Sequence, residues 1–135
     1  MIPTSPTNNQ KLIFVPYFYV AAAASIAASS SAQVPLILDE DADFELHWMT
    51  ATSSLDAATD FRPNNFSVLI TDKNNSRIWA SGRVPQVAFV PRYSMARPVV
   101  LSRRSNLNFD FLNLSSGSAC LPTVVLHGFK VLGLS

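Results

Sequence analysis

Strict alternation of apolar and polar residues is the feature that most constrains what this chain can fold into. Between Asn106 and Leu112, the side chains of Leu107, Phe109 and Phe111 occupy every second position, and polar residues stand between them. Successive side chains of a β-strand point to opposite faces of its sheet, so this pattern is typical of a strand with one buried face. The segment is too regular for a loop and has no helical period.

Two other segments alternate in the same way. Phe66–Thr71 directs Phe66, Val68 and Ile70 inward. Phe44–Thr52 has one expected face with Phe44, Leu46 and Trp48 and an opposite face with Glu45, His47 and Met49. Both are therefore expected to be half-buried strands, with a loop at Ser53–Asn65 between them. A tight turn is expected at Asp72–Ser76, after the second of the two in the chain.

Aromatic and β-branched residues mark further strands. These are expected at Ile13–Val20, Val34–Leu38, Arg77–Ala80, Arg97–Leu101 and Thr123–Leu132. Val84–Val90 contains Pro85 and precedes Pro91, so an edge strand or an extended loop is expected there. Gly128 is expected to mark a bulge. About eight short strands at such spacing predict an all-β fold, an antiparallel, jelly-roll-like β-sandwich.

The length of 135 residues fits one domain. We expect the sandwich to span residues 34–135, after an Ala/Ser-rich connector at 21–33. A short helical turn at Ala21–Ala28 is an alternative for that connector. Residues 1–20 are expected to form an extended N-terminal arm that has room for a first strand, and Met1–Gln10 are too polar and proline-rich to pack much.

The uncharged segment Leu12–Ala28 has a competing interpretation. Small residues follow it at Ser29–Gln33, as in the cleavage region of a secretory leader, and a short membrane anchor is a second alternative. Two features argue against both: only Lys11 supplies a positive charge before the segment, and Pro16 would break a helix within it. We favour a strand with an aromatic cluster.

Composition excludes several classes of protein. Hydrophobic residues make up 48% of the chain and charged residues 14%, which rules out disorder as its overall state. The net charge of +1 gives no global field that would attract nucleic acid or an anionic membrane. Cys120 is the only cysteine, so no internal disulfide can form.

So few ionic groups predict surfaces that are buried against partners, although β proteins are also often poor in Lys and Glu. The charges are uneven as well. Residues 1–75 carry three basic and eight acidic side chains, whereas residues 76–135 carry seven basic and one acidic. This distribution permits complementary contacts between neighbouring copies of the chain.

No catalytic or metal-binding pattern is present in the sequence. His47, His127 and Cys120 are too few, and too far from any ligand spacing, for a zinc site. The acidic residues at 39–43 lack the glycine of a calcium loop, and we interpret them as a solvated turn. No nucleophile elbow or phosphate-binding glycine loop occurs. We therefore expect no enzyme activity, no catalytic residues and no cofactor.

A cluster of four arginines is the strongest candidate for an interface outside the N-terminal arm. Arg92, Arg97, Arg103 and Arg104 lie within thirteen residues, with Tyr93 among them. A nucleic-acid patch is one interpretation. Because the whole chain is nearly neutral, we favour contact with a protein, where the planar fork of Arg can hold two acceptors.

The order of segments resembles a known class of protein. An acidic turn enters D-A-D-F-E-L (41–46), and F-S-V-L-I-T-D-K-N-N-S-R-I-W (66–79) follows. R-P-V-V-L-S-R-R-S-N-L-N-F-D-F-L-N-L-S (97–115) and a closing V-V-L-H-G-F-K-V (124–131) complete the series. This arrangement, over about Tyr17 to Leu132, resembles the small β-sandwich virion proteins of tailed bacteriophages that decorate or cement the capsid or lie at the head–tail region.

The resemblance implies a non-enzymatic protein of the virion, in the capsid or the head–tail region. Its partners would be the major capsid protein or other virion proteins and further copies of itself, as a dimer or trimer, without nucleic acid or membrane. The expected interface residues are Phe14, Tyr17, Phe18, Tyr19, Arg92, Arg97, Arg103 and Arg104. A head–tail adaptor or a tail or fibre-anchoring component is one alternative. A secreted carbohydrate-binding module is another, and it would need Trp48 or Trp79 to be exposed.

Overall fold

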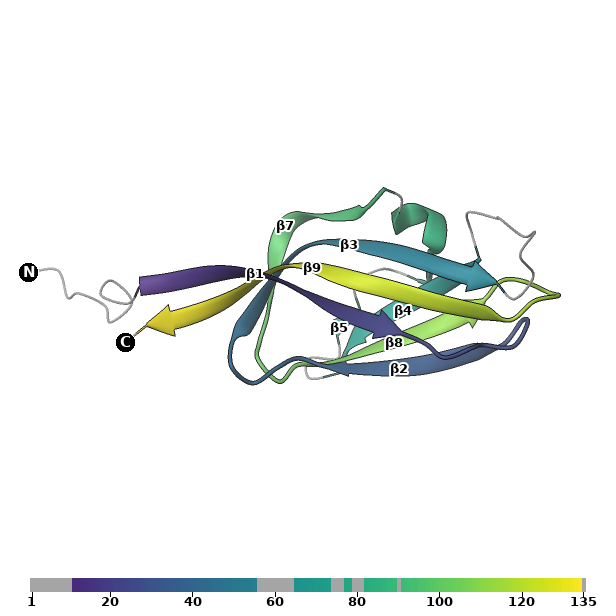
Figure 1. The fold of residues 1–135 in the computed structure, drawn as a ribbon, viewed down its shortest axis with the longest axis horizontal. Helices are drawn as coiled ribbons and strands as arrows, with labels where there is room; N and C mark the ends of the chain where they lie inside the picture. The colour runs from purple at the N-terminus through teal and green to yellow at the C-terminus, as the bar shows by residue number, and fades with distance from the viewer. Residues whose placement is uncertain (1–10, 56–64, 74–76, 79–81, 90, 135) are drawn as a thin grey trace, which may run out of the picture.

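Two antiparallel sheets pack face to face in the computed structural model, which describes residues 11–55, 65–73, 77–78, 82–89 and 91–134 (Figure 1). The first sheet has the order β1 (Lys11–Ala22), β9 (Cys120–Leu134), β3 (Asp43–Leu55), β7 (Tyr93–Leu101). The second has the order β2 (Ser31–Ile37), β8 (Asn106–Asn113), β4 (Phe66–Asp72), β5 (Arg77–Ile78), and the short β6 (Val84–Pro85) also pairs with β4. The expected all-β sandwich is confirmed.

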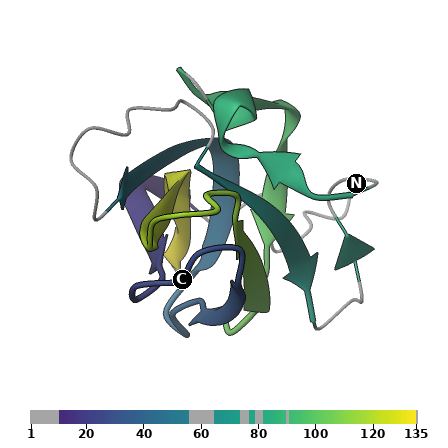
Figure 2. The same ribbon diagram turned by 90° about the vertical axis from the view of Figure 1, so that its right-hand side faces the viewer.

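The core lies between the sheets, which the turned view of Figure 2 shows lying against each other. Phe44 and Leu46 enter it from the first sheet, and both are fully buried. Phe66 and Phe111 from the second sheet meet edge to face with ring centroids 5.4 Å apart. The inward faces expected for Phe66–Thr71 and Asn106–Leu112 are confirmed, because the alternate apolar residues of β4 and β8 are buried.

A β-bulge in β3 reverses the expected direction of two side chains. Leu46 lies opposite Gly128 of β9, but Trp48 lies opposite His127, so His47 is an extra residue without a partner in the register. Beyond the bulge Met49 is buried, whereas Trp48 stands on the outer face of the sheet. The sequence interpretation that placed Trp48 inward and Met49 outward is wrong, because one inserted residue shifts a two-residue period by half.

Two irregular segments differ in part from expectation. Val84–Pro85 forms the short strand β6, but a 3₁₀-helix, η1 (Gln86–Phe89), follows in place of an extended chain and buries Phe89. Ala21–Ala28 contains no helical turn. Its first two residues end β1, and Ile26 forms an isolated bridge with Cys120. Within the described part of the chain, no helix is long and apolar enough to cross a membrane.

The expected hairpin after β4 is present, since Thr71 pairs with Ile78 and Asp72 with Arg77. Most of the loop expected at Ser53–Asn65 lies outside the described residues, and β3 runs on to Leu55. Met1–Gln10 and Trp79, which entered the arm and carbohydrate interpretations, also lie outside them.

The outer ends of β1 and β9 extend past the sandwich. Lys11–Pro16 pairs residue by residue with Phe129–Leu134, and Figure 1 shows the end of this pair projecting from one end of the molecule. Phe129–Val131 also pairs with Asp43–Glu45 of β3. We call Lys11–Pro16 and Phe129–Leu134 the terminal ribbon. The first and last described residues of the chain therefore lie together at the tip of the projection.

Candidate functional site

An uninterrupted apolar surface runs from the terminal ribbon onto the outer face of the first sheet. Phe14 lies opposite Val131, Pro16 opposite Phe129, and Phe18 opposite His127, and residues directly opposite each other share a face. Alternation adds Leu12, and the pairing of Trp48 with His127 adds the tryptophan. We call this surface the outer strip: Leu12, Phe14, Pro16, Phe18, Trp48, His127, Phe129 and Val131.

The outer strip is strongly exposed along β1. Phe14 is 49% and Phe18 61% accessible to solvent, and Leu12 is also exposed. Large apolar side chains this exposed and this close together are uncommon on a monomeric protein and mark interaction surfaces.

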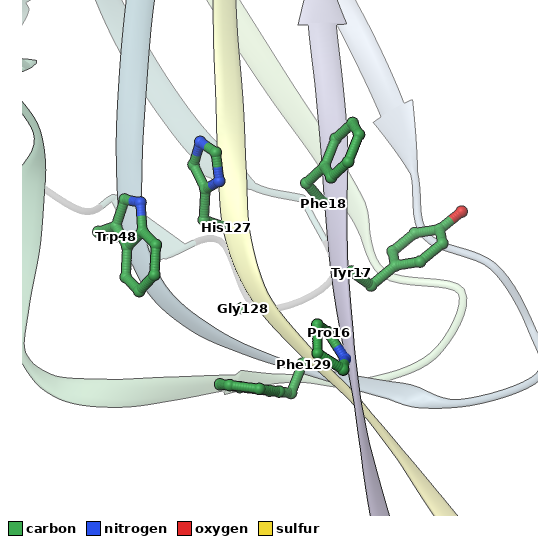
Figure 3. A pocket seen from close by; sticks show the side chains of 7 residues that line it. All are labelled: Pro16, Tyr17, Phe18, Trp48, His127, Gly128 and Phe129. Carbon is green, nitrogen blue, oxygen red and sulfur yellow. The ribbon is translucent and has the colours of Figure 1, made fainter.

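Three rings stand side by side across the strands of the strip (Figure 3). The Trp48 and His127 rings are stacked, with centroids 5.4 Å apart and planes 14° apart, and Phe18 lies 6.3 Å from His127 on the other side. The guanidinium of Arg92 lies 5.0 Å from the centre of the Trp48 ring. This cation–π contact fixes the outer end of the row.

A hollow of about 320 Å³ opens beside the row of rings. Trp48, His127 and Phe18 form one side, Pro16 and Phe129 lie across from them, and Tyr17 and the backbone of Gly128 complete the lining (Figure 3). The lining is almost entirely hydrocarbon and aromatic, so the hollow favours an apolar or ring-shaped group over a charged one.

The electrostatics of the strip keep it uncharged. Burial lowers the pKa of His127, and its Nε2 lies 2.9 Å from Oγ1 of Thr50. The imidazole is therefore neutral at pH 7. His47 and Glu45 form a 2.6 Å contact, and the His47 ring also packs edge to face against Phe129. The strip itself contains no ionised side chain, as in the core of a protein interface.

A buried lysine anchors the base of the terminal ribbon on the opposite face. Lys130 is 8% exposed, and its Nζ donates to Oδ2 of Asp39 at 2.8 Å and to Oδ1 of Asp41 at 3.0 Å. The Nζ also lies 4.1 Å from the centre of the Tyr17 ring. Tyr17 donates to Oδ2 of Asp39, and the backbone N–H of Asp39 donates to the hydroxyl of Tyr19.

These contacts keep the Lys130 ammonium and the Asp39 carboxylate charged. Burial alone would lower the pKa of Lys130, but the hydrogen bonds to Asp39 and Asp41 outweigh it and raise that pKa. The Lys130 hydrogen bond lowers the pKa of Asp39. The acidic turn is exposed at Asp39, Glu40 and Asp41, as expected, and the sequence interpretation missed that two of its carboxylates also hold a buried ammonium.

The acidic turn also binds two of the four arginines. Arg103 donates its backbone N–H to Oδ1 of Asp43 at 2.9 Å, and the Arg104 guanidinium lies 3.0 Å from Glu40. Arg92 lies on Trp48, and no partner of Arg97 occurs among the described residues. The structure therefore gives the arginines separate partners instead of one shared patch.

The aromatic residues expected at an interface divide into two groups. Phe14 and Phe18 lie on the outer strip, and Tyr17 lies at the edge of the hollow. Tyr19 is different: it is 6% exposed and meets Phe44 edge to face in the core, so it cannot serve as a surface contact. Burial also raises the pKa of its hydroxyl.

Sequence reasoning missed three residues of the site, His127, Phe129 and Lys130, and named Trp48 only in the carbohydrate-binding alternative. The bulge hid Trp48, but the odd-numbered positions of β9 would have placed His127 and Phe129 on one outer face. Lys130 falls in the inward register of the same strand, and an inward lysine near four acidic residues is itself a signal for a buried ion pair.

The described residues contain no group of three or more His, Cys, Asp or Glu side chains that could hold a metal ion. Cys120 is fully buried, and burial raises its pKa to about 11, so its thiol is protonated and unreactive at neutral pH. What the outer strip and its hollow offer chemically is apolar binding.

Comparisons with protein-family models, curated proteins and solved structures found no match to this chain.

Proposed function

We propose that the chain is a non-enzymatic structural protein of a tailed-phage virion, a decoration or cement protein that binds the outer capsid surface and stabilises it through contacts between subunits. The observation that carries the proposal is the outer strip. A protein gains stability when an assembly buries such a strip, whereas the free chain leaves the strip exposed to water.

The strand order supports this proposal. With β6 set aside, eight strands pair as first, eighth, third, sixth in one sheet and second, seventh, fourth, fifth in the other. We interpret this order as a jelly roll, an architecture common among viral capsid proteins. A fold supports many functions, so the order adds to the outer strip and does not replace it.

The experiment is quantitative mass spectrometry of purified particles of the phage that carries this gene. The chain is expected in the particle in many copies, as a shell-covering protein requires. A copy number that matches a single ring at the portal would favour the head–tail or tail alternative. Absence from washed particles would overturn the virion role.

A ring-binding module for carbohydrate is the second candidate, and the position of Trp48 favours it. The tryptophan stands on the outer face beside a hollow lined by Phe18 and Phe129, where a sugar ring could stack. Electrophoresis in gels that contain soluble xylan or β-glucan tests this candidate. Retardation of the wild-type chain that Trp48→Ala abolishes would support it, and unretarded migration in every gel would exclude these polysaccharides.

A further inference from the structure

We propose that two copies of the chain pack their outer strips face to face about a two-fold axis near Pro16, so that the Phe14 ring of each copy enters the hollow of the other. This inference rests on the proposed structural role and identifies a second copy of this chain as the partner that binds the outer strip and fills its hollow.

The position of Phe14 relative to the hollow sets the geometry. Phe14 and Phe18 lie on the same face of β1 and, at about 3.3 Å per residue, roughly 13 Å apart. A two-fold axis midway between them, at Pro16, places each Phe14 opposite the Phe18 end of the partner strip. That end carries the hollow between Phe18, Trp48 and Phe129.

The amount of exposed apolar surface fits a dimer interface. At roughly 150–250 Å² for each aromatic side chain, the exposed fractions of Phe14 and Phe18 leave about 200 Å² in water. Leu12, Pro16 and Val20 on the same face of β1, with the half-buried Trp48, Phe129 and Val131, enlarge it. The total is of the same order as the roughly 800 Å² that each partner contributes to a stable complex.

The terminal ribbon would also be stabilised if a second copy packed against it. An isolated pair of strands is marginally stable in water at best. Phe129–Val131 also pairs with β3, but the tip of the ribbon, Lys11–Ile13 with Leu132–Leu134, has no third strand among the described residues and carries exposed apolar side chains (Figure 1). A two-fold arrangement covers the outer face of the ribbon in both copies, since the same patch serves on each side.

The absence of ionised side chains in the outer strip is compatible with two identical strips packing against each other. Two identical charged patches would repel each other, but the strip has no ionised side chain and His127 is neutral. Lys130, the nearest cation of β9, is held by Asp39 and Asp41 on the opposite face. The charged groups beside the strip already have contacts within the chain: Glu45 with His47, Asp43 with Arg103, and Arg92 with the Trp48 ring. These contacts offset part of the cost of covering them when two strips meet.

Sedimentation equilibrium of the full chain tests the proposal. The wild-type chain is expected at twice its 14.7 kDa mass, and Phe14→Asp at the mass of one copy. Ile37→Asp is the matched control, because Ile37 is 63% exposed but lies on β2 of the other sheet. It should remain dimeric. Both positions are exposed, so neither substitution should unfold the sandwich, which circular dichroism verifies.

A mixing experiment tests the pairing of Phe14 with the hollow. Phe14→Asp and Phe18→Lys should each be monomeric alone, because each buries a charge against an apolar partner. Mixed in equal amounts they should form a dimer, in which the introduced carboxylate of one copy meets the introduced ammonium of the other. A mixture that stays monomeric overturns this geometry.

A monomeric wild type at 100 μM, or a Phe14→Asp variant as dimeric as the wild type, would overturn the dimer itself. Failure of the dimer and failure of the virion role can be told apart. A chain that is monomeric in solution but present in particles contradicts only the dimer, and a dimeric chain absent from particles contradicts only the virion role.

Discussion

Gly128 illustrates how one residue shapes the site. A Cβ at this position would overlap the backbone carbonyl of Glu45 on β3, so only glycine lets the two strands approach here. The approach coincides with the bulge at His47, and the bulge turns Trp48 outward. The aromatic row and the hollow therefore depend on a missing side chain that contributes only backbone to their surface.

Replacing this glycine should be costly. Gly128→Ala is expected to lower the free energy of unfolding by about 1–3 kcal/mol, because the added methyl group meets backbone that cannot rotate away. Gly133→Ala on the same strand is the control, since a Cβ there has open space, and it should be nearly neutral. Urea denaturation followed by circular dichroism measures both. Equal effects of the two substitutions would contradict this account of the bulge.

Lys130 makes stability depend on pH. The pKa of Asp39 is lowered in the folded chain, so its contribution is present above pH ~4 and disappears as pH falls through the folded pKa. The pKa of Lys130 is raised, so its contribution is complete below pH ~10.4 and disappears as pH rises through the folded value.

Lys130→Met is therefore expected to cost about 1–3 kcal/mol at pH 7, through lost charge-assisted hydrogen bonds. The difference from wild type should shrink as pH falls from about 4 through the lowered pKa of Asp39 in the folded chain. Urea denaturation at several pH values between acid and neutral measures it. A difference that stays constant over this range would show that the ion pairs with Asp39 and Asp41 do not contribute.

Among the elements, the strands were the most predictable. Phe66–Thr71 and Asn106–Leu112 alternate because each has one face on the core, so position in sequence determined burial directly. Alternation could not predict the face of the sheet on which Trp48 lies, because the bulge that turns it outward depends on how β3 pairs with β9. Likewise, η1 forms where Phe89 turns into the core, a tertiary effect that overrides the extended pattern around Pro85.

One buried side chain reinforces the backbone hydrogen bonds that hold the connector between β1 and β2. Asn113 is buried, and its Nδ2 donates to the carbonyls of Ile26, Ala27 and Ser118, while its Oδ1 accepts from the N–H of Ser115. This amide joins the connector to the turn before β9. It explains how a segment of small residues keeps a fixed path across the end of the sandwich.

Asn113→Ala should lower the free energy of unfolding by about 1–3 kcal/mol, because it leaves the buried N–H of Ser115 and the carbonyl of Ser118 without their partner. Asn108→Ala, on the same strand and half-buried, is the control and should cost under about 1 kcal/mol. Thermal denaturation of both variants measures the difference. A loss no larger at Asn113 than at Asn108 would contradict the role of the amide as a clamp.

At the scale of the whole molecule, a rigid sandwich presents a projecting apolar ribbon at one end and ion-paired loops around its base. The core explains why the sandwich folds, but it leaves Leu12, Phe14 and Phe18 in water. Under the proposed function, these residues are covered in an assembly. We therefore regard the terminal ribbon and the outer strip as the working surface of the protein and the sandwich as its support.

Rebinding to particles that lack the protein tests this central claim most directly. Particles from a genome without the gene would be incubated with purified chain, and the bound amount measured after sedimentation. Wild type and Ile37→Asp are expected to bind to the same saturation, and Phe14→Asp to bind weakly or not at all. Equal binding of all three would contradict the claim that the outer strip assembles the protein.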